Sequence, residues 1–134
     1  MSQEKFELKD TLGNLKPRIL EGSFVFTTSN DELDHLMKTF KPIATFREEE
    51  GITLVISKDE ADKFNIKYDS LFRCISLGVH SSLNSYGLIS SISRELTKKK
   101  ISSNVFSGFY HDHIFVQADL ADTAIQVINS LDHS

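Results

Sequence analysis

Two stretches of the chain repeat one residue pattern at an interval of sixty positions. After a shift by that interval, Phe46 aligns with Phe106, and no gap is needed between residues 40 and 62. The pairs of identical residues are Asp59 and Asp119, Ala61 and Ala121, and Asp62 and Asp122. In both copies a hairpin pattern precedes Asp-x-Ala-Asp and a helical pattern follows it. The chain is therefore predicted to contain two similar modules, which restricts its fold more than any single motif does.

The second copy has the clearer pattern of secondary structure. Residues 72–79 predict a strand, and the apolar residues between 88 and 96 then lie on one side of a helix. Residues 101–116 are rich in β-branched and aromatic residues, with a polar break at His111-Asp112-His113. This pattern predicts a hairpin that turns at the tripeptide. A last helix is expected after Asp119, which would cap it.

The first half is predicted to follow a similar order. The elements expected there are an amphipathic helix over residues 7–19, a strand over 23–28, a short helix over 32–40, a hairpin over 43–57 that turns at Glu50-Gly51, and a helix over 59–64 capped by Asp59. Residues 65–70 read as a connector or an edge strand. We therefore divide the sequence into a first module at 1–68 and a second module at 69–134.

The composition excludes several classes of protein. Of the 134 residues, 40% are hydrophobic and 25% are charged, and the formal net charge of −4 argues against a nucleic-acid partner. No stretch approaches the ~18 consecutive apolar residues of a membrane span, and the N-terminal residues lack the apolar core of a signal peptide. The single cysteine, Cys74, suits a reducing compartment. A cytoplasmic protein without a membrane partner or a cofactor is expected.

The start of the long second-half helix is a candidate ligand site. Serine, asparagine and glycine crowd residues 80–87, just before the apolar helical pattern begins. A helix N-terminus exposes unpaired backbone N–H groups and a partial positive charge, so a carboxylate or phosphate could bind there without a cationic side chain. The alternative is that Ser82 or Asn84 serves only as an N-cap.

The sequence resembles the ACT-domain family of small-molecule-binding regulatory modules, and in particular small bacterial proteins made of two ACT-like modules. The stretches that carry the resemblance are residues 42–51, 72–83, 87–93 and 107–116. The resemblance implies an α+β fold with two tandem ferredoxin-like βαββαβ modules, each with an antiparallel sheet covered by helices on one face. It also implies that ligands, often amino acids, bind where modules pair.

Carried over residue by residue, the resemblance implies a ligand site near the start of the second module's first helix. Its expected members are His80, Ser81, Ser82, Leu83, Tyr86, Gly87 and Leu88, with Asn104 and Phe106 on the following strand. The first module departs from the pattern because its first helix is short and lacks a glycine-rich loop. The second module lacks a final strand, which the 65–79 region or a second chain would have to supply.

Other functions are weighed against ligand sensing by a non-enzymatic module. His111 and His113 could share a metal ion, with His80 as a further ligand, if they occupied alternate strand positions. Catalysis is not expected, because neighbouring strand residues such as His80 and Ser81 point to opposite sides and Cys74 lies among apolar residues. A purely dimerising module is the remaining alternative. Strand 103–110 carries bulky residues on both faces, which predicts a homodimer.

Overall fold

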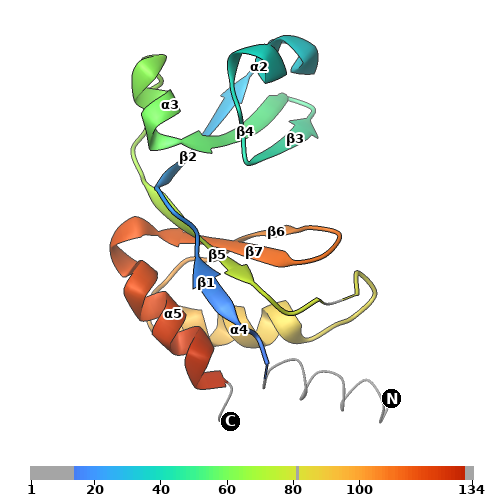
Figure 1. Cartoon of the computed structure of the whole chain (residues 1–134), viewed down its shortest axis with the longest axis vertical. Coiled ribbons are helices and arrows are strands. Elements are labelled where there is room, and N and C mark those ends of the chain that lie inside the picture. The colour runs from blue at the N-terminus through green and yellow to red at the C-terminus, as the bar shows by residue number, and fades with distance from the viewer. Residues whose placement is uncertain (1–13, 81, 132–134) are drawn as a thin grey trace. The chain divides into compact units, whose positions relative to one another are not determined.

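The computed structural model describes residues 14–80 and 82–131 (Figure 1). Its elements are, in chain order, β1 (Pro17–Ile19), β2 (Phe24–Ser29), α2 (Leu33–Thr39), β3 (Ala44–Glu48), β4 (Gly51–Ser57), α3 (Lys58–Lys63), β5 (Phe72–Leu77), α4 (Leu88–Lys98), β6 (Asn104–Ser107), β7 (Asp112–Gln117), the 3₁₀ turn η1 (Ala118–Leu120) and α5 (Ala121–Ser130). Among these elements no helix has the length and apolar character needed to cross a membrane.

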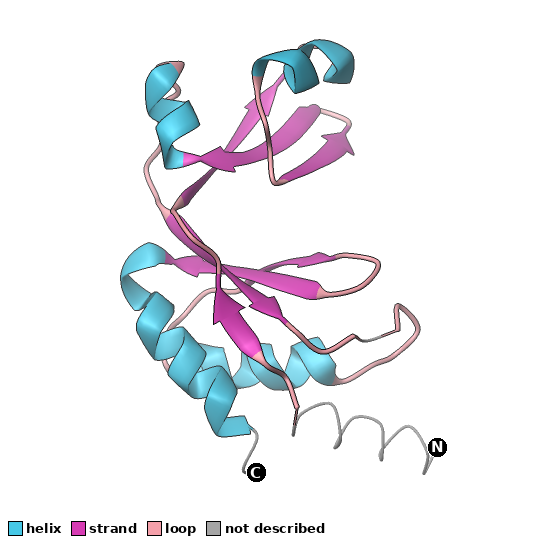
Figure 2. Cartoon of the chain, in the orientation of Figure 1, coloured by secondary structure: helices cyan, strands magenta, loops and turns pink. Residues whose placement is uncertain are grey.

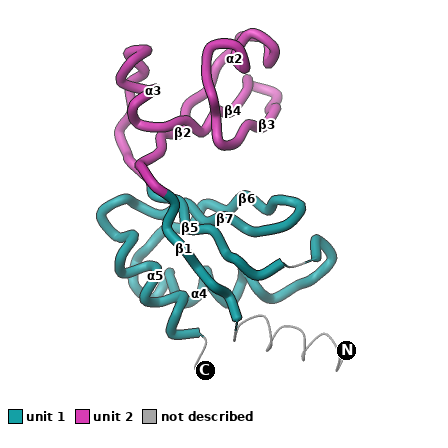
Figure 3. Tube along the Cα trace, in the orientation of Figure 1, with its two compact units in different colours: residues 1–20, 73–134 teal, residues 21–72 magenta. Residues whose placement is uncertain are grey.

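The described residues form two compact units (Figure 3). Unit 1 contains residues 14–20 and 73–131, and unit 2 contains residues 21–72. This division differs from the predicted boundary between residues 68 and 69, because residues near the start of the chain pair with β5. The boundary at 68/69 stays a prediction for the sequence modules.

Unit 1 is a sheet with its two helices, α4 and α5, on one face (Figure 2). Its strands lie in the order β1-β5-β7-β6. Alternate strand residues such as Ile75, Leu77, Ile114 and Val116 pack against the apolar sides of the helices. The helical core residues are Leu88, Ile92 and Leu96 of α4 and Ala121, Ala124 and Ile128 of α5. The helix predicted from the apolar spacing between 88 and 96 is confirmed.

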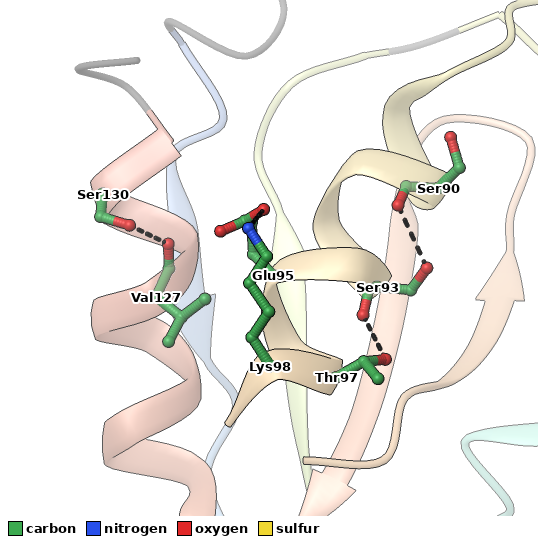
Figure 4. Close-up of polar contacts among 7 residues, drawn as sticks. All are labelled: Ser90, Ser93, Glu95, Thr97, Lys98, Val127 and Ser130. Atoms are coloured by element: carbon green, nitrogen blue, oxygen red, sulfur yellow. Dashed lines mark hydrogen bonds and ion pairs between the residues drawn. The ribbon is translucent and has the colours of Figure 1, made fainter. Parts of the chain in front are cut away.

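Polar side chains of α4 and α5 form hydrogen bonds or ion pairs within their own helix (Figure 4). Ser93 donates to the carbonyl of Ser90 at 3.3 Å, and Thr97 donates to the carbonyl of Ser93 at 2.6 Å. Lys98 pairs with Glu95 at 2.8 Å in the last turn of α4. Hydroxyls that bond the preceding turn of their own helix do not need a tertiary partner. The polar face of α4 is therefore satisfied within the helix, and the apolar face determines its packing.

Unit 2 repeats the arrangement with shorter helices. Its strands lie in the order β3-β4-β2, and α2 and α3 cover one face of them (Figure 2). The buried core contains Val25, Leu54 and Ile56 from the sheet, Leu36 from α2 and Ala61 from α3. The predicted α+β fold with two ferredoxin-like modules is confirmed.

The two hairpins match in register at the predicted interval. In unit 2, Thr45 pairs with Leu54 and Phe46 with Thr53. In unit 1, the partners sixty positions later, Val105 with Ile114 and Phe106 with His113, pair in the same way. The repeat seen in the sequence is thus a repeat of strand pairing.

Gly51 shows why the first hairpin needs glycine directly after its turn. Its φ is +156°, and a Cβ there would lie 2.9 Å from the carbonyl oxygen of Ser29. That distance is shorter than real Cβ contacts, and the facing atom belongs to the backbone, which cannot move aside cheaply. The turn itself lies at residues 49–50, one position before the predicted Glu50-Gly51, because Gly51 is already the first residue of β4 and pairs with Glu48. The glycine permits a close approach of β2.

The helix predicted over residues 7–19 is wrong at its C-terminal end. Residues 17–19 form β1, which pairs antiparallel with β5 (Pro17 with Leu77, Ile19 with Ile75). Residues 7–13 of that prediction lie outside the described residues. Leu15 and Ile19 pack in the core of unit 1, and the edge of β5 offers backbone partners that a local helix cannot use. β1 thereby supplies the strand that the second module lacks after α5.

The second hairpin turns earlier than predicted. The turn lies at residues 108–111, where the amide of Gly108 donates to the carbonyl of His111 at 2.9 Å. Asp112 and His113 are the first residues of β7 and not part of the turn. The predicted caps also differ. Ser57, and not Asp59, caps α3 by accepting from the amide of Glu60 at 3.1 Å, while Asp119 lies in η1, before α5 begins.

Candidate ligand-binding cleft

The first wall of the cleft is the start of α4. Gly87 is the N-cap with φ +96°, in the left-handed region that favours glycine, and no side chain caps the helix. The first intrahelical bond runs from the amide of Ser91 to the carbonyl of Gly87 at 3.0 Å. The amides of Leu88, Ile89 and Ser90 precede it and have no acceptor within the helix. All three residues line a cleft of about 190 Å³.

A compact turn forms the rim beside this helix start. The hydroxyl of Ser82 accepts from the amide of Asn84 at 3.1 Å, and its carbonyl accepts from the amide of Ser85 at 3.0 Å. The hydroxyl of Ser85 donates to the same carbonyl at 2.6 Å. Because these bonds are local, the turn holds Leu83 and Tyr86, both largely exposed, at the mouth of the cleft.

The opposite wall comes from the second hairpin. Ser107 and Asp112 face each other across the β6–β7 ladder, and with Gly108 they line the cleft. Asp112 is only 8% exposed, so its carboxylate is largely withdrawn from solvent. The cleft therefore has main-chain donors and the positive end of a helix dipole on one side, and a carboxylate on the other.

The structure brings together part of the predicted site. Ser82, Leu83, Tyr86, Gly87 and Leu88 line the cleft. Ser81 lies outside the described residues. The ring of His80 contacts Tyr110, with ring centroids 5.6 Å apart, and His80 does not line the cleft. Asn104 and Phe106 do not line the cleft either. Asn104 donates to the carbonyl of Phe115 at 3.4 Å, and the ring of Phe106 contacts the ring of Phe115.

Six lining residues were missed by sequence reasoning. They are Ser85, Ile89, Ser90, Ser107, Gly108 and Asp112. The last three were missed because the turn was placed at 111–113. Gly108, four residues before Asp112, is the signal that could have placed the turn correctly, since glycine is one of the residues that dominate turns.

The histidines near the hairpin are held by separate partners. Nδ1 of His111 lies 3.1 Å from the carbonyl of Val79, and Nδ1 of His113 lies 2.6 Å from the hydroxyl of Ser76. Burial, followed by the nearby His111, lowers the pKa of His113 below its ordinary value. Within residues 14–80 and 82–131, no group of three or more His, Cys, Asp or Glu is placed to hold a metal ion. The metal hypothesis for His111 and His113 gains no support.

The potential nucleophiles are poorly placed for catalysis. Cys74 is fully buried, and burial raises the pKa of its thiol to about 11. A serine–histidine hydrogen bond does exist, between Ser76 and His113, which the sequence did not indicate. Ser76 is buried and neither residue lines the cleft. The cleft itself contains hydroxyls, amides and a carboxylate, a set suited to holding a polar ligand.

Unit 2 has a cleft at the corresponding corner, with different chemistry. It is about 320 Å³ and lies among residues 31–34 at the start of α2, Arg47 of β3 and Ile52 of β4. By the sixty-residue offset, Arg47 replaces Ser107 and Ile52 replaces Asp112. The helix start here carries Asp31, Glu32 and Asp34 and no glycine. The two corners therefore cannot bind the same ligand in the same way.

Comparisons with known proteins agree with this architecture. Two sequence models of the ACT domain match the chain, one over residues 5–73 and the other over residues 69–130. No match is found among the curated proteins. The fold and these matches define a protein built of tandem regulatory-type α+β modules. The chain belongs to the ACT-domain family and carries two of its modules.

Solved structures with the same fold include three that cover most of this chain. A protein of unknown function from Vibrio cholerae, described as a possible transport protein, is 37% identical, with a TM-score of 0.86, over 96% of this chain and 98% of its own. A protein from Agrobacterium tumefaciens is 16% identical, with a TM-score of 0.72, over 89% and 90%. The regulatory subunit of aspartate kinase from Thermus flavus is 7% identical, with a TM-score of 0.63, over 87% and 96%. The last two show a shared fold alone.

Proposed function

We propose that this protein is a non-enzymatic regulatory module that binds an amino acid in the unit 1 cleft. The observation that carries the proposal is the pairing of opposite charges across the cleft. The uncapped amides of Leu88, Ile89 and Ser90 suit the carboxylate of the ligand, and the carboxylate of Asp112 suits its ammonium group. Ser82 and Ser107 also line the cleft and can offer hydroxyls to the ligand.

Several findings support this function. The chain belongs to the ACT-domain family, and a regulatory subunit of aspartate kinase has the same fold. The cleft is small, which suits a compact amino acid better than a nucleotide. We therefore expect that His80, Asn104 and Phe106, which do not line the cleft, make no direct contact with the ligand.

One ligand is expected per chain. The corresponding corner of unit 2 has Ile52 where unit 1 has Asp112, and its carboxylates lie at the helix start, where unit 1 offers main-chain donors to the ligand's carboxylate. Arg47 and the three carboxylates at its helix start already balance each other's charge in part. The unit 2 corner therefore does not take a second copy of the same ligand.

A thermal-shift screen of the common amino acids tests the proposal. A ligand stabilises the folded state by RT ln(1 + [L]/Kd), so about 2.7 kcal/mol is gained at a concentration of one hundred times Kd. The hit is then titrated calorimetrically against the wild type, Asp112→Asn and the matched control Asp119→Asn, whose carboxylate lies outside the cleft. We expect one site per chain, at least tenfold weaker binding to Asp112→Asn and unchanged binding to the control. A flat screen, or equal binding by both variants, would reject the site.

The protein is also proposed to form a homodimer through the hairpin end of unit 1. β6 is an edge strand, and Phe109 and Tyr110 at its turn keep most of their side chains exposed. Sedimentation velocity at micromolar concentration should give the mass of two chains. Phe109→Ser should shift the equilibrium toward the monomer, and a monomeric wild type would reject this part of the proposal.

A further inference from the structure

Unit 2 has a second cleft, at the opposite end of its helices from the corner described above. It has a volume of about 440 Å³ and lies between the C-terminal end of α2 and the helix α3. The cleft exists because both helices are short: α2 has 7 residues and α3 has 6, against 11 in α4 and 10 in α5. At the sixty-residue offset, unit 1 has the buried residues Ile101 and Ala124 where unit 2 has Lys41 and Phe64. Ile101 belongs to the buried core of unit 1, whereas Lys41 lines the cleft of unit 2.

The cleft has an apolar wall that is partly exposed. Its members are Phe24, Ile43 and Phe64, and Ile43 and Phe64 remain 43% and 38% exposed. The ring of Phe64 is held by an edge-on contact with Phe40, with ring centroids 4.9 Å apart. Covering an aromatic surface that is fixed in place and still partly exposed to water is favourable, because apolar area is removed from solvent.

The charges at the rim favour an anion. The amide of Lys41 donates to the carboxylate of Glu60 at 3.0 Å, which fixes this side chain and uses one of its oxygens. The ammonium groups of Lys41 and Lys63 form no ion pair with any carboxylate in the described part of the chain, while Lys58 on the same helix pairs with Asp62 at 2.8 Å. Lys63 lies over the ring of Phe64, 5.3 Å from its centroid. Two cations and one anion leave the rim with a positive charge beside the aromatic wall.

We infer that this cleft binds a small organic carboxylate with an aromatic or branched apolar body and no ammonium group. The apolar body covers Phe64 and Ile43, and the carboxylate lies between Lys41 and Lys63. An added ammonium group would be repelled by the two lysines, and Glu60 can offset this only in part because its carboxylate already accepts from the backbone. The site is independent of the unit 1 cleft, since it lies in the other module. It also excludes the ammonium group that the unit 1 cleft is proposed to bind.

The test uses phenylacetate as the probe and ¹H–¹⁵N correlation spectra of the full chain as the readout. The amide of Lys41 is the reporter, because its hydrogen bond to Glu60 lies on the cleft. We expect phenylacetate to shift this amide and those of Lys63 and Phe64 saturably. Benzylamine and benzyl alcohol, which match its ring but not its charge, should bind at least tenfold more weakly.

Variants separate the site from non-specific binding. The double variant Lys41→Gln, Lys63→Gln should weaken phenylacetate binding at least tenfold, and Phe64→Ala should weaken it as well. The matched control is Lys58→Gln, which removes a lysine from the same helix but outside the cleft. The inference is overturned if the shifts map to residues 82–90, if benzyl alcohol binds as well as phenylacetate, or if Lys58→Gln weakens binding as much as the double variant. The spectra also show directly whether each variant is folded.

Discussion

Replacing Leu15 by alanine tests whether the segment around β1 belongs to the unit 1 core. Leu15 is 0% exposed and packs in the cluster that contains Ile75, Leu96 and Ile128. Truncation of a fully buried leucine removes its transfer free energy and leaves a cavity, at a cost of about 2–5 kcal/mol. Leu15 lies just before an edge strand, where the chain can relax more than in the middle of a sheet. We therefore expect a loss of about 3 kcal/mol.

Urea unfolding followed by far-UV circular dichroism measures this loss. With a cost of about 3 kcal/mol, the thermal midpoint should also fall by on the order of 10 °C for a chain of this size. The control is Leu83→Ala, because Leu83 is 65% exposed and its truncation should change stability by less than about 0.5 kcal/mol. If Leu15→Ala were no more destabilising than Leu83→Ala, the segment would not contribute to the core and the placement of β1 on β5 would be refuted.

Three further predictions concern single sites in unit 1. A Cβ at Gly78 would lie 2.9 Å from Cβ of Lys16 and 3.0 Å from its carbonyl, so Gly78→Ala should displace β1 and cost about 1–3 kcal/mol in urea unfolding; unchanged stability would contradict this contact. Cys74 should stay unmodified by a thiol reagent at pH 8 until the protein unfolds, because burial raises the pKa of its thiol to about 11. Rapid labelling of the folded protein would be inconsistent with that burial. The pKa of His113 is lowered from 6.5 in the folded state, chiefly by burial, with the neighbouring His111 and Arg18 lowering it further and Asp112 opposing them. The unfolded chain therefore binds the proton more readily, and stability should be full above pH 6.5 and decline as the pH falls below it. His113→Gln should flatten the decline of the urea midpoint between about pH 7 and pH 5, and equal slopes would show that other groups cause it.

The sequence was most informative where local pattern and long-range pairing agree. The hairpin of β3 and β4 was predicted because glycine next to its turn and apolar residues on both strands favour one register. α4 was predicted because its apolar residues follow the helical period. These elements need no information from distant parts of the chain.

The errors occur where a distant partner decides the structure. Residues 15–19 have helical spacing of their apolar side chains, but the edge of β5, about sixty residues later in the sequence, offers them a ladder of hydrogen bonds. Asp112 and His113 look like turn residues because they are polar. In the structure Asp112 lies on the wall of the cleft and His113 bonds Ser76 across strands, two environments that cannot be read from their neighbours in sequence. For the same reason only part of the candidate site was predicted from the sequence: the residues at the start of α4 were predicted, and those of the hairpin were not.

Helix length accounts for the different chemistry of the two modules. In unit 1 the 11 residues of α4 form a full helix without a side-chain cap at its N-terminus, and Ile101, shortly after its C-terminal end, belongs to the buried core. In unit 2 the 7 residues of α2 form barely two turns, so the helix dipole that would attract a carboxylate is weak and acidic residues occupy its start. At the other end of α2 lies the second cleft, where Lys41 takes the position of the buried Ile101 of unit 1. A chain with two copies of one module can in this way present two clefts of different specificity without changing the pairing of its strands.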